Sequence, residues 1–198
     1  MASVPPRIIG CELVTDFVQR LLDTTHTDTH LIVCGSRDDF LAQLSAVIQS
    51  QQPPNHGLRT KTIAILAKSS KIRVAFCPSL ESLRAHLAVL APAQKDGPRL
   101  LAILDTVALH VSTTEFSAQG LSRTFATAVE AASRTNSELR LCECCDAIDP
   151  TNTDCGGQMW DAHVPLLNGS VRIRGEERAW GGRGVTVRRV AQRWFEFD

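Results

Sequence analysis

One short apolar run constrains the fold of this chain more than any other stretch. Residues 100–104 read Leu-Leu-Ala-Ile-Leu without polar alternation, and Gly97 and Pro98 end any helix or strand that precedes them. Such a run is typical of a strand buried on both faces, as in the centre of a parallel sheet. Asp105 follows directly and is expected at the carboxyl end of that strand, where open α/β sheets bind their ligands.

The strand alone leaves two interpretations of Asp105 open. In nucleotide-binding α/β proteins an aspartate at this place, the Walker B position, holds a magnesium ion near the phosphates. The other interpretation is that Asp105 caps the turn or helix that follows it.

Apolar strands alternate with amphipathic helices along the chain, which predicts an α/β fold with a mostly parallel sheet flanked by helices. Strands are predicted at residues 31–35, 62–67, 72–76, 100–105 and 139–144, and helices at 12–23, 39–49, 80–90 and 120–134. Near the C-terminus, residues 185–190 and 194–197 are predicted to form an antiparallel hairpin, preceded by an alternating strand at 171–174.

Length and charge narrow the class of protein. The chain has 198 residues, enough for one sizeable domain, and its 21 basic and 21 acidic side chains leave no global field that would attract nucleic acid.

We expect an N-terminal helical segment, 1–30, followed by one domain, 31–198. The apolar face of the helix at 12–23 is expected to pack either on a partner subunit or on the domain's own sheet. No apolar run has the length of a membrane helix, so we expect no membrane contact.

A degenerate phosphate-binding loop is expected after the strand that ends in Gly35. A P-loop has the pattern G-x-x-x-x-G-K-[ST], in which backbone amides and a lysine hold phosphate while a hydroxyl binds magnesium. Counting from Gly35, Phe40 stands at the second glycine, Leu41 at the lysine and Ala42 at the hydroxyl position. Asp38 adds negative charge where phosphate needs positive charge. We therefore expect no ATP hydrolysis and no nucleotide cofactor.

The seven cysteines suggest two chemistries. Without a secretion signal they are interpreted as reduced thiols of the cytosol or nucleus, several of them buried. A zinc site is the alternative, but the spacing C-x-C-C-x9-C lacks the paired knuckles of structural zinc sites. We therefore expect no metal ion at Cys142, Cys144, Cys145 and Cys155.

The C-terminal region is the one strongly basic part of the chain. Seven arginines lie between residues 172 and 193, with tryptophans among them. Phosphate contacts by arginine and base stacking on aromatic rings are how proteins hold single strands. The alternatives are arginines that are merely solvated or that pair with an acidic partner subunit. The candidate DNA-binding residues are Arg172, Arg174, Arg183, Arg188, Arg189, Arg193 and Trp180.

Together these segments resemble the small, divergent recombinase paralogues of the Shu complex, which have a RecA-like core. The resemblance covers residues 30–198 and is carried by the segment 72–79 with its leucine-rich helix, the strand ending in Asp105, residues 160–172 and the basic hairpin. Carried over by position, Gly35 matches the first P-loop glycine and Asp105 the Walker B aspartate. Lys68 falls near the place of the catalytic glutamate of an active recombinase.

The resemblance implies a nuclear, non-catalytic subunit. Such a subunit pairs with a SWIM-domain protein or another recombinase paralogue, and the assembly supports recombinase filaments on single-stranded DNA during homologous recombination. Two other expectations remain open: a RecA-like structural subunit without DNA contact, as in the Elongator accessory ring, and a pseudo-GTPase scaffold.

Overall fold

A computed structural model describes residues 5–24, 28–50, 58, 62–91, 99–168 and 184–198 of the chain. It is an α/β structure with a six-stranded, wholly parallel sheet and a separate two-stranded antiparallel sheet. The predicted fold class is thereby confirmed. The large sheet has the order β3-β2-β4-β5-β1-β8, and its strands are β1 (Arg7–Ile8), β2 (Asp28–Val33), β3 (Ile72–Phe76), β4 (Arg99–Leu104), β5 (Glu138–Cys142) and β8 (Glu196–Phe197).

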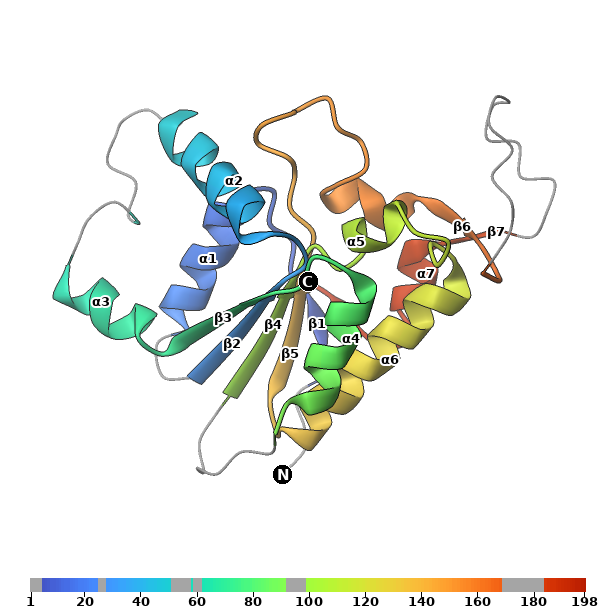
Figure 1. The fold of residues 1–198 in the computed structure, drawn as a ribbon, viewed down its shortest axis with the longest axis horizontal. Coiled ribbons are helices and arrows are strands. Elements are labelled where there is room, and N and C mark those ends of the chain that lie inside the picture. Colours follow the sequence, from blue (N-terminus) through green and yellow to red (C-terminus); the bar gives the residue numbers. More distant parts are fainter. Residues whose placement is uncertain (1–4, 25–27, 51–57, 59–61, 92–98, 169–183) are drawn as a thin grey trace.

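Helices cover both faces of the sheet (Figure 1). On one side lie α1 (Val14–Asp23), α2 (Arg37–Ser50) and α3 (Ile63–Ser69). On the other lie α4 (Leu80–Val89), α6 (Ala118–Arg134) and α7 (Val187–Ala191), with the short α5 (Ala108–Val111) above the ends of the strands. Each face has its own apolar cluster, and Phe17 and Phe125 are among the largest fully buried side chains of the two.

The run at residues 100–104 forms the centre of this core, as its composition predicted. β4 lies between β2 and β5, with Leu104 in register with Val33 on one side and Cys142 on the other. All five side chains of the run are at most 2% exposed. A strand buried on both faces needs apolar side chains at every position, which explains why the run shows no alternation.

The N-terminal segment belongs to the same body as the rest. β1 was not predicted, yet it lies between β5 and β8, and Glu196 donates its amide to the Pro6 carbonyl at 2.9 Å. The apolar face of α1 packs on the chain's own sheet, where Phe17 is 1% and Leu21 2% exposed. Of the two expectations for this helix, packing on the sheet is therefore the one the structure shows.

Two sequence predictions of local structure were wrong. The predicted strand at 62–67 is instead the start of helix α3: the Thr62 hydroxyl accepts the Ile65 amide and caps the helix, which begins at Ile63. The segment 185–190 does not pair with 194–197: β7 (Gly184–Thr186) pairs antiparallel with β6 (His163–Pro165), and the chain then turns through α7. Thr186 caps α7 by accepting the Arg189 amide, and β8 joins the large sheet parallel to β1. The predicted strand at 171–174 lies outside the described residues.

Among the residues that the structure describes, no helix combines the length and the apolar composition needed to cross a membrane.

Candidate functional site: a carboxylate pair at the carboxyl edge of the sheet

The Asp105 carboxylate is the group around which the carboxyl edge of the sheet is arranged. Its backbone has φ 61, a left-handed conformation that aspartate tolerates better than most residues. This turn lets the Asp105 amide donate to the Cys142 carbonyl, while the Cys144 amide donates to Asp105 Oδ1, both at 2.8 Å. The side chain is thus directed along the sheet edge toward the end of β5.

Glu143, which follows β5, supplies a second carboxylate. It is 2% exposed, and its two oxygens accept the amides of Val107 at 2.6 Å and Ala108 at 3.1 Å. These amides begin α5 and have no carbonyl partner of their own within that helix. Glu143 therefore serves as the cap that joins the end of β5 to the segment after β4.

The two carboxylates influence one another. Burial raises the pKa of Asp105 to about 7, against the hydrogen bond from Cys144, which lowers it. Burial also raises the pKa of Glu143 well above its usual range, and the charge of Asp105 raises it further. Two neighbouring acids in such surroundings both ionise less readily than isolated carboxylic acids do.

A chain of hydrogen bonds connects Thr106, next to Asp105, with the buried side chain of His110 and with α6 and α4. His110 is fully buried; its Nδ1–H donates to the Thr106 carbonyl at 2.9 Å and its Nε2 accepts the Thr124 hydroxyl at 3.1 Å. Arg84 donates to the same hydroxyl and to both oxygens of Glu115. Burial lowers the pKa of His110 to about 4, so the ring is neutral and this tautomer is fixed by its partners.

The predicted phosphate loop is near the pair but lacks the second glycine, the lysine and the hydroxyl of a P-loop. Gly35 follows β2, and a Cβ added to it would meet no atom within 4 Å. Phe40, Leu41 and Ala42 lie in α2, where Leu41 is 44% exposed. Just before this loop, Cys34 Sγ donates a long hydrogen bond, at 4.0 Å, to the hydroxyl of Thr106, which follows Asp105.

The chemistry of the donor set therefore does not fit a magnesium-bound nucleotide. Magnesium prefers ionised carboxylates and keeps several waters, whereas Asp105 has a raised pKa and one oxygen bound to a backbone amide. No lysine occurs between Gly35 and Ser50 to reach a phosphate. The other strand–glycine–helix unit, from β1 through Gly10 to α1, contains no lysine either.

The positional match of Lys68 to a catalytic glutamate was wrong. Lys68 lies in the last turn of α3, before β3 begins, and its ammonium group is 3.7 Å from Asp23. Asp23 ends α1 and precedes β2, so both residues lie at the amino edge of the sheet, opposite Asp105. The error follows from the wrong assignment of residues 62–67 as a strand.

The cysteines divide into separate groups. Cys142 and Cys144 share one face of β5 and its extension, with their sulfur atoms 3.7 Å apart, while Cys145 is exposed. Cys155 accepts the Asp146 amide at 3.1 Å. Within the described ranges, no three or more histidine, cysteine or acidic side chains form a group that could hold a metal ion.

The predicted DNA-binding residues are only partly described. Arg188 is bound within the chain: it forms a 3.0 Å ion pair with Asp161 and lies over the Phe197 ring, 4.8 Å from its centre. Arg189 and Arg193 are exposed. The residues Arg172, Arg174, Arg183 and Trp180 lie outside the described residues.

Sequence reasoning missed Glu143 as a member of the site. Its position in an alternating segment, Leu-Arg-Leu-Cys-Glu-Cys, made it look like an ordinary strand residue. The available signal was that carboxylates follow two strands, at 105 and 143, whose ends become neighbours if the strands pair in parallel.

No curated protein matches this chain. One family model matches it across residues 7–197, which covers the large sheet from β1 to β8 and both carboxylates of the site. The chain therefore belongs to the SPAC22G7.03-like family.

Proposed function

We propose that this chain is a non-catalytic, RecA-like subunit of a Shu-like complex, which promotes recombinase filament assembly on single-stranded DNA in homologous recombination repair. The observation that carries the non-catalytic part is the engagement of Asp105 and Glu143 by backbone amides of Cys144, Val107 and Ala108. In an active enzyme of this architecture the carboxyl edge holds nucleotide and metal. Here it holds the strands and α5 together.

An exposed apolar surface supports the role as a subunit. α3 has no buried residue; Ile63 is 86% and Leu66 60% exposed, and α3 leads directly into the edge strand β3, where Val74 is 47% exposed. Large exposed apolar side chains on an edge strand and on the helix before it are typical of surfaces that another protein covers. We assign this surface to the partner subunit, a SWIM-domain protein or another RecA-like paralogue.

The proposal includes direct contact between this chain and single-stranded DNA. In the described part of the basic region, Arg189 and Arg193 have exposed side chains available to phosphate. The second candidate function, a RecA-like structural subunit without DNA contact, is favoured by Arg188, which is held by Asp161 and Phe197. The two candidates differ in what the assembled complex binds.

The proposal is tested by purifying the tagged full-length chain from its native cells and identifying the proteins that accompany it. We expect a SWIM-domain protein or a recombinase. If Elongator subunits accompany the chain instead, the proposal fails and the second candidate function takes its place. The double variant Ile63→Asp with Leu66→Asp should lose the partner. The matched control is Ile148→Asp, at a residue 58% exposed and on a different segment, which should retain it.

The DNA contact is tested on the assembled complex with Arg189→Ala and Arg193→Ala combined. Each lost phosphate contact lowers the salt slope of single-strand binding by about 0.7, so the variant should bind more weakly and with a flatter salt dependence. Arg37→Ala, at an exposed arginine in α2, is the control. Unchanged affinity and slope in the double variant would remove these two arginines from the DNA surface.

A further inference from the structure

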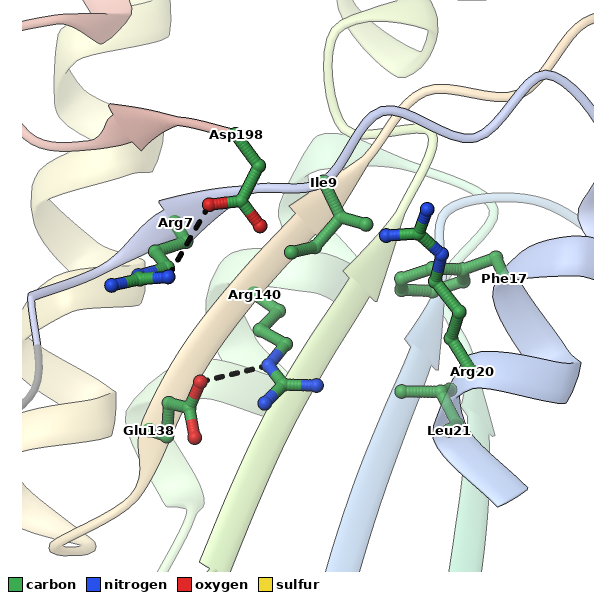
Figure 2. A pocket seen from close by; sticks show the side chains of 8 residues that line it. All are labelled: Arg7, Ile9, Phe17, Arg20, Leu21, Glu138, Arg140 and Asp198. Atoms are coloured by element: carbon green, nitrogen blue, oxygen red, sulfur yellow. Dashed lines mark hydrogen bonds and ion pairs between the residues drawn. The ribbon is translucent and has the colours of Figure 1, made fainter. Parts of the chain in front are cut away.

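A pocket of about 160 Å³ lies between α1 and the strands at the β1 end of the sheet (Figure 2). It is several times larger than the space one water needs. Three guanidinium groups and two side-chain carboxylates meet over an apolar wall in this pocket. Its lining residues are Arg7, Ile9, Phe17, Arg20, Leu21, Glu138, Arg140 and Asp198.

The three arginines are not equally paired. Arg140 Nε is 2.8 Å from Glu138 Oε1, and Arg7 Nη1 is 3.4 Å from Asp198 Oδ1. Across the described residues, the exposed Arg20 side chain has no ion pair or hydrogen bond, so its guanidinium is accessible to a ligand from solvent. Figure 2 shows its guanidinium reaching from α1 across Phe17 toward Ile9. Of the three guanidinium groups, Arg20 is therefore the one without a carboxylate partner among the described residues.

Donors remain free on the paired arginines as well. Arg7 Nε is buried and has no hydrogen-bond partner among the described residues. Arg140 uses Nε for Glu138 and Nη1 for the Thr24 hydroxyl, at 3.3 Å, which leaves Nη2. An unsatisfied buried N–H group is costly, so an incoming acceptor would be bound favourably here.

We propose that this pocket binds a phosphate group, held chiefly by the Arg20 guanidinium with Arg7 and Arg140 on its other sides. Guanidinium forks suit phosphate because each donates two parallel hydrogen bonds, and a tetrahedral anion offers oxygens to forks that arrive from different directions. A carboxylate presents its two oxygens in one plane and can satisfy fewer of these donors. The apolar wall, where Phe17 is 1% and Ile9 7% exposed, lowers the local dielectric constant and strengthens the contacts.

The test is calorimetric titration of the full-length protein with sodium phosphate and, separately, with O-phosphoserine, at constant ionic strength. Sodium acetate is the control ligand. We expect phosphate binding with a dissociation constant of about 1 mM or lower, and weaker binding of acetate. Tighter binding of O-phosphoserine than of inorganic phosphate identifies a phosphorylated molecule as the source of the group, and the reverse order identifies the free ion.

Variants locate the site. Arg20→Gln should weaken phosphate binding about tenfold or more, because a charge-assisted hydrogen bond is lost. Arg20→Lys, which keeps the charge but loses the fork, should weaken it less. Arg37→Gln is the matched control at an exposed arginine outside the pocket and should bind as wild type does. Equal affinity of Arg20→Gln and wild type, or wild-type binding of phosphate no tighter than of acetate, would overturn the proposal.

Discussion

The backbone amide of Cys144 lies 2.8 Å from Oδ1 of Asp105, and this bond directs the carboxylate along the sheet edge. The aspartate thus joins the end of β4 to the end of β5, and the two acids Asp105 and Glu143 share one buried polar site. The stability of this site therefore depends on the protonation state of the two acids.

Asp105 is expected to make the protein less stable as the pH rises. Its pKa is 3.8 when unfolded and about 7 when folded, so the folded state binds more protons between these values. The free energy of unfolding should therefore fall as pH rises from about 4 to about 7. Asp105→Asn keeps the acceptor for Cys144, tolerates the positive φ and cannot ionise. It should be about 1–3 kcal/mol more stable than wild type at pH 8.

Urea denaturation of both proteins at pH 4, 6 and 8 measures this difference. It should be small at pH 4 and should grow to a plateau above pH 7. A difference that does not change with pH would show that the ionisation of Asp105 is not linked to folding.

Removing the Glu143 side chain should destabilise the fold through the cap of α5. Glu143→Ala leaves the buried amides of Val107 and Ala108 without acceptors, which we expect to cost about 2–4 kcal/mol. Glu143→Gln retains one acceptor oxygen and should lose less. Chemical denaturation at pH 7 is the measurement, and Glu130→Ala, an exposed acid on α6, should change stability by less than about 0.5 kcal/mol. Equal losses in the Ala and Gln variants would contradict the capping role.

In the Arg20→Gln variant, whose proposed phosphate pocket beside α1 is weakened, magnesium and ATP together should leave the melting temperature unchanged. A ligand that binds only the folded state raises apparent stability, and the loop after Gly35 offers neither a lysine nor a hydroxyl at the expected positions. Thermal denaturation with and without Mg-ATP, combined with a phosphate-release assay, tests this point. Hydrolysis that disappears in Asp105→Ala would reverse the interpretation of this edge.

Helix α1 should be required for folding of the isolated chain. Phe17 is 1% exposed in the apolar cluster on its face of the sheet, and Phe17→Ala should cost about 3–5 kcal/mol. Gln19→Ala, on the same helix but outside the cluster, should cost less than about 0.5 kcal/mol. Circular dichroism during urea denaturation compares the two variants. A stable, cooperatively folded fragment lacking residues 1–28 would show that this segment is dispensable.

How far the sequence could predict this fold depends on the length of each element. The uniform apolar run of β4 and the leucine spacing of α4 predicted their types, because a long enough pattern distinguishes the two periods. Residues 63–67 are apolar throughout and too few to show either period, so the cap at Thr62 decided the helix. β1 and β8 have two residues each, too few for any sequence pattern, and they are strands only because they pair with a neighbouring strand in the sheet.

The candidate site was half predicted for a similar reason. Asp105 was recognised because it ends a strand with an unmistakable pattern, whereas the role of Glu143 arises from the amides of Val107 and Ala108, which are far from it in the sequence. The pocket beside α1 depends on Arg7, Arg20 and Arg140, three residues from separate elements. No local pattern indicates that they meet.

The position of β1 between β5 and β8 has a consequence for how the chain is made. β1, at residues 7–8, forms hydrogen bonds with β8, at residues 196–197: the Glu196 amide donates to the Pro6 carbonyl, and the Asp198 amide donates to the Ile8 carbonyl. The outer side of β1 therefore has no strand partner until synthesis of this sequence is nearly complete. Contacts between such distant residues slow folding and leave strand edges exposed meanwhile. We expect this side of the sheet to close only once residues 196–197 have been synthesised, with the unpaired edge as the part of the nascent chain that chaperones protect.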